Sequence, residues 1–395
     1  MRLVKIPIGQ LRPGMFIAEI DRPWLETPFA LQGFLVRDYE DIHFIARYVN
    51  HVKVDIDYGG SQRFMLETPP PQKKPPTVFN RLQLRDDFQE AKLHFETAHE
   101  SLDRVFESIK NGIPTDVGAV RKAVNPLIDS VFRNKDAVAA LVRLKETSEY
   151  RYEHSISMSV WAAILGRHIG LLRDELEKLV IGCAMCDVGM TKLPESLLNS
   201  AEPLNDKQRE EIREHPMVGS QMVTHTGGTD FEILAIIENH HERHNGSGYP
   251  RGMEGAAIPL LARIAGLVDT YDAMITPQPY SPSRSSFEAV QELINISGEL
   301  FQESLVEQFI QAIGLYPTGA LVELNTGEVA IVVKQNDNRR LKPELVVVLD
   351  TDKSPLPTLK LLDLGKTPLV GPDSCWIIKE LKPGSYGVNS EEFFV

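Results

Sequence analysis

Cysteine is scarce in this chain, which has three in 395 residues. So few cannot build a disulfide scaffold, and they are typical of a protein from a reducing compartment. Positive charge is also in short supply, because 42 lysines and arginines stand against 55 aspartates and glutamates, a net charge of −13. This balance argues against a nucleic-acid partner and against non-specific binding to anionic membranes.

Long apolar runs are missing as well. The first ten residues lack the apolar core of a signal peptide, and the run from Ile258 to Val268 is interrupted by Arg263. We therefore expect a cytoplasmic protein without a membrane span. With 42% hydrophobic and 25% charged residues the chain can build real cores, which excludes wholesale disorder. Its length predicts two or three domains.

Shifts in composition divide the chain into consecutive parts. These are a small α+β module (1–60), a proline-rich linker (61–82), a helical connector (83–148), a helical core (149–313) and a β-rich C-terminal region (314–395). Strands are predicted at 3–6, 30–36, 52–56, 320–324, 328–333, 345–349 and 359–364, and the first module should also hold a helix near 38–48. The fold class is therefore mainly α.

One helical segment of the connector carries a regular apolar stripe. Its members alternate steps of three and four: Phe88, Ala91, Phe95, Ala98, Leu102, Val105 and Ile109. The stripe is consistent with a helix packed on its own domain, and a homodimer joined through it is the alternative. In the next helical region, Pro126 predicts a kink or a break.

Polar residues in apolar or helical surroundings are concentrated in the core, where seven of the 11 histidines lie. The most notable are His154, Asp187, His215, the pair His240 and His241, and Asp269 with Asp272. A carboxylate in an apolar run, such as Asp187, is costly unless it is paired or bound to a metal. Imidazole and carboxylate are ligands of zinc, iron and manganese. The spacing alone leaves a metal site and scattered structural polar residues equally open.

A glycine-rich stretch from His244 to Gly255 follows the histidine pair. Its spacing fits neither a P-loop nor a dinucleotide fingerprint, so composition alone favours a long turn as much as a functional loop. The Cys183-x-x-Cys186 pair lies on a predicted helix without a βαβ context, which argues against a redox motif.

Together these residues resemble the HD-GYP family, a branch of the HD-domain phosphohydrolases. The match is nearly position for position over 240–250 and continues at 258–264 and 269–274, while the first 60 residues resemble an uncharacterised module that often precedes this domain. The resemblance implies an all-helical HD-domain bundle and a metal-dependent phosphodiesterase that hydrolyses the bacterial second messenger cyclic di-GMP.

The resemblance also implies a ligand set and catalytic residues. The metal ligands would be His154, Cys186, Asp187, His215, His240, His241 and Asp269. They would hold iron, manganese or zinc, in a binuclear arrangement bridged by an aspartate, and the metal would activate a water and neutralise charge on the phosphodiester. Asp187 and Asp272 would be catalytic.

Several positions depart from the family pattern. Cys186 replaces a histidine ligand, and Met190 replaces a lysine that assists the phosphate; Lys192 is expected to point elsewhere. Other departures are Asn245 in place of an aspartate, Gln278 and Ser281 in place of basic phosphate contacts, and Tyr150 where some members place a glutamate that supports a third metal. Losing one preorganised donor costs roughly 10²–10³-fold in rate, so the site is predicted to be degenerate.

Three functions stay open from the sequence. The first is an impaired HD-GYP protein that binds metal, cyclic di-GMP or a partner with little hydrolysis. The family's loop, here Asn245, Gly246, Gly248, Tyr249 and Pro250, is associated with contacts to diguanylate cyclase domains. The second is an active cyclic di-GMP phosphodiesterase with an altered metal site. The third is a structural dimeric adaptor.

Overall fold

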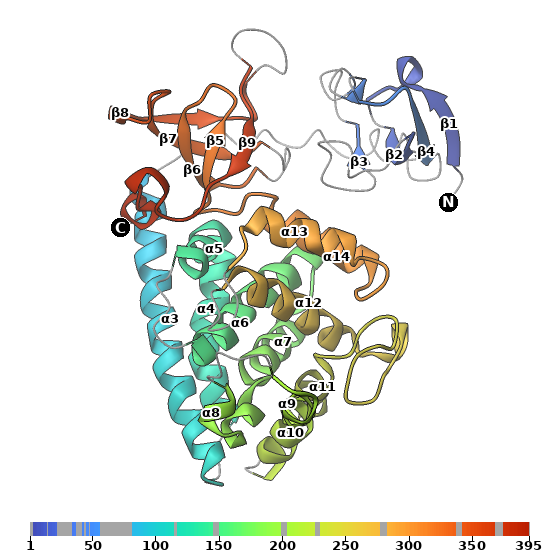
Figure 1. The fold of residues 1–395 in the computed structure, drawn as a ribbon, viewed down its shortest axis with the longest axis vertical. Coiled ribbons are helices and arrows are strands. Elements are labelled where there is room, and N and C mark those ends of the chain that lie inside the picture. Colours follow the sequence, from blue (N-terminus) through green and yellow to red (C-terminus); the bar gives the residue numbers. More distant parts are fainter. Residues whose placement is uncertain are drawn as a thin grey trace. The chain divides into compact units, whose positions relative to one another are not determined.

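The chain forms two units in a computed structural model, one of them mostly N-terminal (Figure 1). The structure describes residues 3–13, 15–21, 34–36, 42, 45–46, 48–55, 81–113, 117–144, 150–198, 204–225, 230–276, 283–336, 342–367 and 374–394. The first unit comprises residues 1–81 with 366–375, and the second comprises 82–365 with 376–395.

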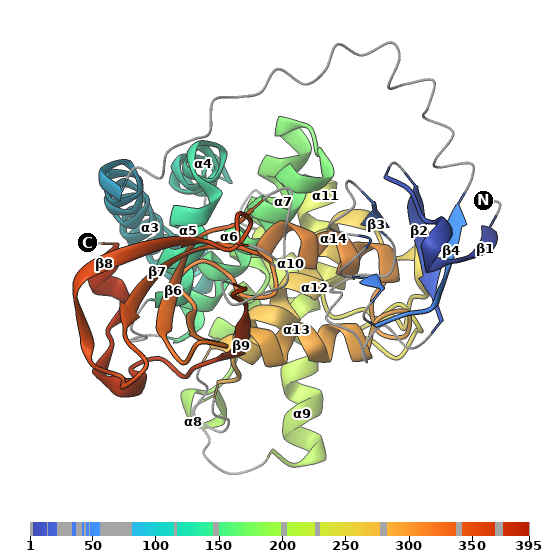
Figure 2. The ribbon, with the colours of Figure 1, turned by 90° about the horizontal axis from the view of Figure 1, so that it is seen from above.

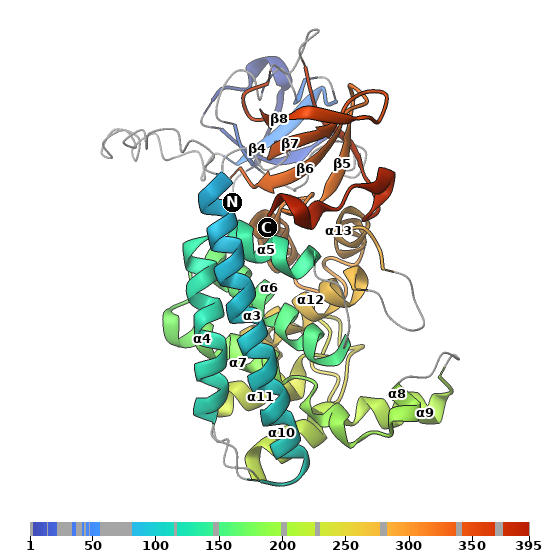
Figure 3. The same ribbon diagram turned by 90° about the vertical axis from the view of Figure 1, so that its left-hand side faces the viewer.

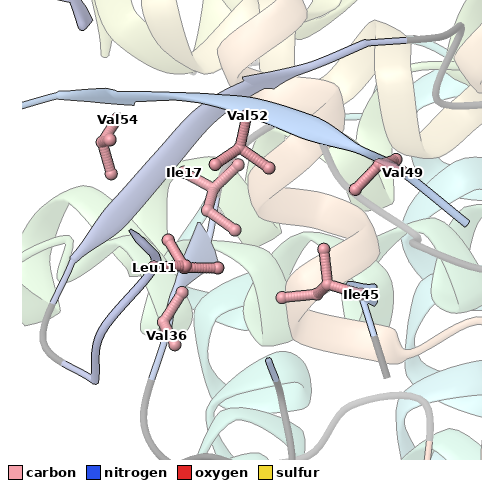
Figure 4. Packing of buried hydrophobic residues seen from close by; sticks show 7 residues of the cluster. All are labelled: Leu11, Ile17, Val36, Ile45, Val49, Val52 and Val54. Atoms are coloured by element: carbon pink, nitrogen blue, oxygen red, sulfur yellow. The ribbon is translucent and has the colours of Figure 1, made fainter. Parts of the chain in front are cut away.

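The N-terminal unit contains a four-stranded antiparallel sheet in the order β1-β4-β2-β3. Its strands are β1 (Leu3–Pro7), β2 (Phe16–Ile20), β3 (Phe34–Leu35) and β4 (His51–Asp55). Val52 and Val54 of β4 are buried on one face, as the two-residue period of a strand requires. They pack with Leu11, Ile17, Val36, Ile45 and Val49 in a small core of their own (Figure 4). Most of the predicted helix near 38–48, and nearly all of the predicted linker, lie outside the described residues.

The second unit is built on helices. They are α3 (Arg81–Lys110), α4 (Val117–Arg133), α5 (Lys135–Leu144), α6 (Tyr150–Ile169), α7 (Arg173–Met185), α8 (Glu195–Leu198), α9 (Asp206–Arg213), α10 (His215–His225), α11 (Phe231–Asn239), α12 (Leu260–Ile275), α13 (Ser286–Asn295) and α14 (Glu303–Ile313). Helix α6 is buried on all sides from 154 to 165 and packs against α7, α12 and α14. A helix that is buried on every side lies at the centre of its bundle. Within the described residues, no helix combines the length and apolar character needed to cross a membrane.

The apolar stripe of α3 is buried within its own chain. All seven of its members are buried, and α3 runs beside α4 (Figures 1 and 3). A ring nitrogen of His94 on α3 lies 2.9 Å from the hydroxyl of Ser130 on α4. The amide of Asn134, the residue after α4, donates to Asp87 of α3 at 2.8 Å. The structure therefore agrees with the interpretation of α3 as a helix packed on its own domain.

Helix α4 continues through Pro126, so the alternative of a break at this residue is wrong. Proline lacks the N–H that would bond the carbonyl four residues earlier. That residue, Lys122, is exposed, which lets water take the place of the missing donor.

The C-terminal region forms a five-stranded antiparallel sheet in the order β8-β7-β6-β5-β9. Its strands are β5 (Leu321–Leu324), β6 (Val329–Lys334), β7 (Glu344–Leu349), β8 (Pro355–Asp363) and β9 (Ile377–Glu380). The predicted hairpin and both further strands are present, whereas β9 was not predicted. The sheet joins the helical body through a buried ion pair between Arg143 of α5 and Glu380 of β9.

Candidate metal centre

Four side chains that could hold a metal ion converge in the helical body. They are Asp187, His215, His240 and His241, and one ligand atom from each lies within 4.8 Å of the others. Asp187 follows α7 and precedes the short 3-10 turn η4 (Val188–Lys192), and His215 is the first residue of α10. His240 caps the C-terminus of α11, with His241 next to it.

Local sequence explains how these elements meet. Helix α11 begins at an aspartate cap, where Asp230 accepts hydrogen bonds from the backbone of Glu232 and Ile233, and its isoleucines are buried. Gly189 of η4 lies against the backbone of α10, so close that a Cβ there would stand 2.1 Å from the carbonyl oxygen of His215. Only glycine lets this turn bring Asp187 up to His215.

The backbone fixes the orientation of two imidazoles. His215 Nδ1 lies 2.7 Å from the carbonyl of Ile212, and His240 Nδ1 lies 2.8 Å from that of Ile237. If each Nδ1 carries the proton and donates it, each Nε2 presents a lone pair. The two Nε2 atoms are 3.3 Å apart, and that of His215 is 3.4 Å from Asp187 Oδ1. Lone pairs and a carboxylate that face one another at these distances fit a cation.

Burial keeps the histidine pair neutral. Burial, followed by the nearby His215, lowers the pKa of His240 to about 4. Burial and the neighbouring His240 also lower the pKa of His241 well below its ordinary value. Neutral imidazole is the form that binds metals, so the chemistry of the donor set supports a metal centre.

A second group beside the cluster joins His154 to two carboxylates of α12. His154 Nε2 lies 3.0 Å from Asp269 Oδ1, and its Nδ1 lies 2.7 Å from Asp272 Oδ2. Burial opposes the charged form of His154, but these hydrogen bonds outweigh it and raise its pKa well above the usual range. Both ring nitrogens of His154 therefore lie within hydrogen-bonding distance of a carboxylate.

Asp269 links this group to the cluster, because its Oδ2 lies 3.7 Å from His241 Nδ1. Burial disfavours the charge on Asp269, yet the hydrogen bond with His154 and the nearby imidazoles keep its pKa lowered. Asp272 is more deeply placed and also accepts a hydrogen bond from the Trp161 indole at 3.0 Å. Its contacts are those of a residue that orients His154.

Cys186 does not join the four-residue cluster, although it stands at a predicted ligand position. It caps the C-terminus of α7 and is fully buried. Burial raises the pKa of its thiol well above the usual range, whereas the thiolate is the metal-binding form. The predicted ligand roles of His154, Cys186 and Asp269 stay predictions.

The structure locates some of the other positions that depart from the family pattern. Met190 lies in η4, and the amine of Lys192 donates to the carbonyl of Lys110 at 2.6 Å, away from the cluster. Gln278, Ser281 and the side chain of Tyr150 lie outside the described residues.

The glycine-rich loop folds back on the histidine pair. A Cβ at Gly248 would meet the backbone nitrogen of Arg243 at 2.4 Å, so this close return requires glycine. The Tyr249 ring stacks on His241 with centroids 4.7 Å apart, and Pro250 follows through a cis peptide bond. The Asn245 side chain accepts hydrogen bonds from the backbone and hydroxyl of Ser247, and Gly246 has a positive φ.

Three residues of this region had no predicted role. Buried Glu242 accepts hydrogen bonds from the backbone of Arg251 and Met253, which ties the loop to the end of α11. Trp161 orients Asp272, and Arg213 lies over the Tyr249 ring. Only Glu242 carries a sequence signal, since it directly follows the histidine pair.

Comparisons with known families match three consecutive parts of the chain. A domain of unknown function, DUF3391, matches residues 3–120, the HD domain matches 136–305, and the KOW domain associated with HD domain matches 321–386. The HD domain match contains all four cluster residues.

Individual relatives and one solved structure are also similar to this chain. The cyclic di-GMP phosphodiesterase PA4108 of Pseudomonas aeruginosa is 29% identical over 375 residues, 92% of this chain and 89% of that protein. The cyclic di-GMP phosphodiesterase response regulator RpfG of Xanthomonas campestris pv. campestris is 30% identical over 176 residues, 43% of this chain and 47% of that protein. Bd1817, a HDG"Y"P protein from Bdellovibrio bacteriovorus, aligns with a TM-score of 0.49 at 18% identity, over 78% of this chain and 98% of that chain. The chain thus carries a match to the HD domain over residues 136–305, between a match to the DUF3391 module and one to the KOW domain associated with HD domain.

Proposed function

We propose that this chain is a cyclic di-GMP signalling protein whose HD domain binds a divalent transition metal and the nucleotide but hydrolyses the nucleotide little. The names of the relatives PA4108 and RpfG support the nucleotide. The observation that carries the metal is the pair of Nε2 atoms, 3.3 Å apart in His215 and His240, beside Asp187.

The residues that would hold the metal are Asp187, His215, His240 and His241. Iron, manganese and zinc all accept imidazole and carboxylate ligands. When bound, such an ion activates a water and neutralises charge on a phosphodiester. His154 and Asp269 lie beside this cluster and would be ligands of the second ion that the family resemblance implies.

Weak hydrolysis follows from two positions next to the cluster. Cys186 stands where the family has a histidine ligand but is not one of the four residues of the cluster, so it adds no ligand there. Met190 supplies no cation where charge develops on a leaving oxygen. The loss of one preorganised donor costs roughly 10²–10³-fold in rate, and a missing ligand adds to that loss.

Metal binding is tested on the full chain, reconstituted without oxygen with iron(II) or manganese. We expect the original chain to bind the metal, and His215→Ala to bind it at least roughly tenfold more weakly because a ligand is lost. His225→Ala is a matched control, since His225 lies on the same helix and its Nδ1 also meets a backbone carbonyl, that of Gln221, but it is exposed. Equal metal contents in both variants would contradict the site.

An active phosphodiesterase with an altered metal site is the second candidate, favoured by the match to PA4108 along 92% of this chain. The double variant Cys186→His with Met190→Lys separates the two. Under the proposal it gains hydrolysis of cyclic di-GMP over the original chain, measured by chromatography of linear dinucleotide and GMP. An original chain that already turns over as fast as the double variant supports the second candidate. If the double variant gains neither metal nor turnover, the defect extends beyond these two positions.

A further inference from the structure

Arg213 stands beside the metal cluster, two residues before His215. It is the last residue of α9, a helix that projects from the helical body (Figures 2 and 3). Its guanidinium carbon lies 5.4 Å from the centre of the Tyr249 ring. That ring stacks on His241 with an angle of 25° between the planes. Tyr249 is therefore in contact with a cluster imidazole and with a cation.

The guanidinium of Arg213 is weakly held. The side chain is 56% exposed, and its ionic neighbour is Glu210 at 3.6 Å on the same exposed helix. Exposed pairs of this kind contribute little free energy, so a stronger anion can replace the Glu210 carboxylate.

Other cations near the cluster are bound to protein groups. Arg243 donates to the carbonyls of His240 and Glu242, both at 3.0 Å. Arg251 donates to Asn239 at 3.0 Å and to Glu238 at 2.8 Å, and Lys192 is bound to the carbonyl of Lys110. Among these cations of the described residues, Arg213 is the one whose donors are available to a ligand.

We propose that Arg213 binds a phosphodiester oxygen of a nucleotide held at the cluster, an inference that rests on the proposed function. Gly189, the residue before the neutral Met190, lies against the backbone of His215, two residues after Arg213. A guanidinium offers two parallel donors that match the oxygens of a phosphate. Its position over the Tyr249 ring holds it near the cluster before the ligand arrives.

Calorimetry on the metal-loaded full chain tests the proposal with two probes, cyclic di-GMP and bis(p-nitrophenyl) phosphate, a phosphodiester without guanine. Arg213→Gln should raise the Kd of both probes roughly tenfold or more, the usual effect of losing a hydrogen bond to a charged group. Arg213→Lys should lose less, since it keeps the charge.

Arg209→Gln is the matched control. Arg209 lies one turn earlier on the same helix, is 58% exposed, and pairs with Asp206 at 3.7 Å as Arg213 does with Glu210. It should change either Kd by less than about twofold, because it is one helical turn further from the cluster.

The possible outcomes separate the role of Arg213 from the proposed function of the chain. Equal losses in Arg213→Gln and Arg209→Gln would overturn the role of Arg213 and leave nucleotide binding intact. If the original chain binds bis(p-nitrophenyl) phosphate but not cyclic di-GMP, the proposed function fails, and the comparison of the two variants on that probe still decides the role of Arg213. An original chain that binds neither probe overturns both.

Discussion

At the scale of single residues, the centre of the cluster depends on contacts with the backbone. His215 and His240 are each oriented by a carbonyl three residues earlier on their own chain segment, which leaves both Nε2 atoms pointing at one place. The missing Cβ of Gly189 then allows Asp187 to approach. The site therefore depends on tight packing as much as on the ligands themselves.

Gly189→Ala should damage the metal site without removing a ligand. The new methyl would meet the carbonyl oxygen of His215 at 2.1 Å, and the turn must move to avoid it. We expect a loss of about 1–3 kcal/mol in the free energy of unfolding and at least tenfold in metal affinity. Metal titration and urea unfolding measure both. Gly9→Ala, where a Cβ has open space, should change neither; unchanged metal affinity in Gly189→Ala would refute the packing argument.

Trp161→Phe tests the support of the His154 group. The substitution removes the indole N–H that Asp272 accepts at 3.0 Å and leaves a buried carboxylate with one donor fewer. The free energy of unfolding should fall by roughly 2–4 kcal/mol. Trp376→Phe, at a tryptophan that is 52% exposed, should stay within about 0.5 kcal/mol in the same urea titration. Similar losses in the two variants would mean that the hydrogen bond to Asp272 contributes little.

The sequence locates the candidate site better than it describes the arrangement of its residues. The family resemblance selects Asp187, His215, His240 and His241, and the structure brings these four together. The resemblance could not predict that Cys186 is buried outside the cluster, because the position of Cys186 depends on how the end of α7 packs against its neighbours. Arg213 was missed because its contact with Tyr249 joins residues far apart in the chain, which no local pattern records.

At the scale of elements, α3 is stabilised by its long apolar stripe. The spacing predicted the helix, and burial of the stripe within the chain favours packing on its own domain over pairing of two chains. A homodimer through some other surface stays a prediction. Hydrophobic periodicity identifies which face of a helix is buried, but not which chain covers it.

Leu102→Ala and Leu93→Ala compare the two faces of α3. Leu102 belongs to the buried stripe, so its truncation should cost about 2–5 kcal/mol of the free energy of unfolding. Leu93 is 61% exposed, and its truncation should change that free energy by less than about 0.5 kcal/mol. Urea unfolding at several protein concentrations measures both. A loss in Leu102→Ala that disappears at high concentration would show that the stripe pairs two chains.

At the scale of the second unit, the C-terminal sheet is fastened to the helical body by polar contacts. Arg143 and Glu380 form an ion pair at side-chain exposures of 10% and 1%, and Glu380 also accepts the backbone N–H of Phe287 at 2.8 Å. The Asp136 carboxylate of α5 accepts a hydrogen bond from the Thr318 hydroxyl at 3.0 Å.

Glu380→Gln should loosen this junction. It leaves the buried guanidinium of Arg143 without its counter-charge, at a cost of about 3–5 kcal/mol. Glu391→Gln is the control, because Glu391, in the C-terminal segment after the sheet, pairs with Lys92 of α3 at 3.1 Å in a more exposed contact, worth about 1 kcal/mol or less. Thermal unfolding compares them. Equal shifts in Tm would contradict a junction that depends on the buried pair.

Much of the architecture could be predicted from the sequence, and the exceptions have physical reasons. Periodicity and turn residues predicted the helical body and four of the five C-terminal strands. Strand β9 was missed because none of its four residues is buried and its two isoleucines are adjacent, so it lacks the alternation of apolar and polar residues that marks a strand. Contacts such as the Arg143–Glu380 pair join residues more than 200 positions apart, which local patterns do not record.

The central claim is that this HD domain binds metal and cyclic di-GMP with little turnover. The most direct measurement incubates the metal-loaded chain with cyclic di-GMP, without oxygen, and follows the nucleotide by chromatography alongside calorimetry. We predict that the nucleotide is bound and stays largely intact over many hours. Conversion to linear dinucleotide or GMP that disappears in Asp187→Ala would contradict the account and establish an active phosphodiesterase.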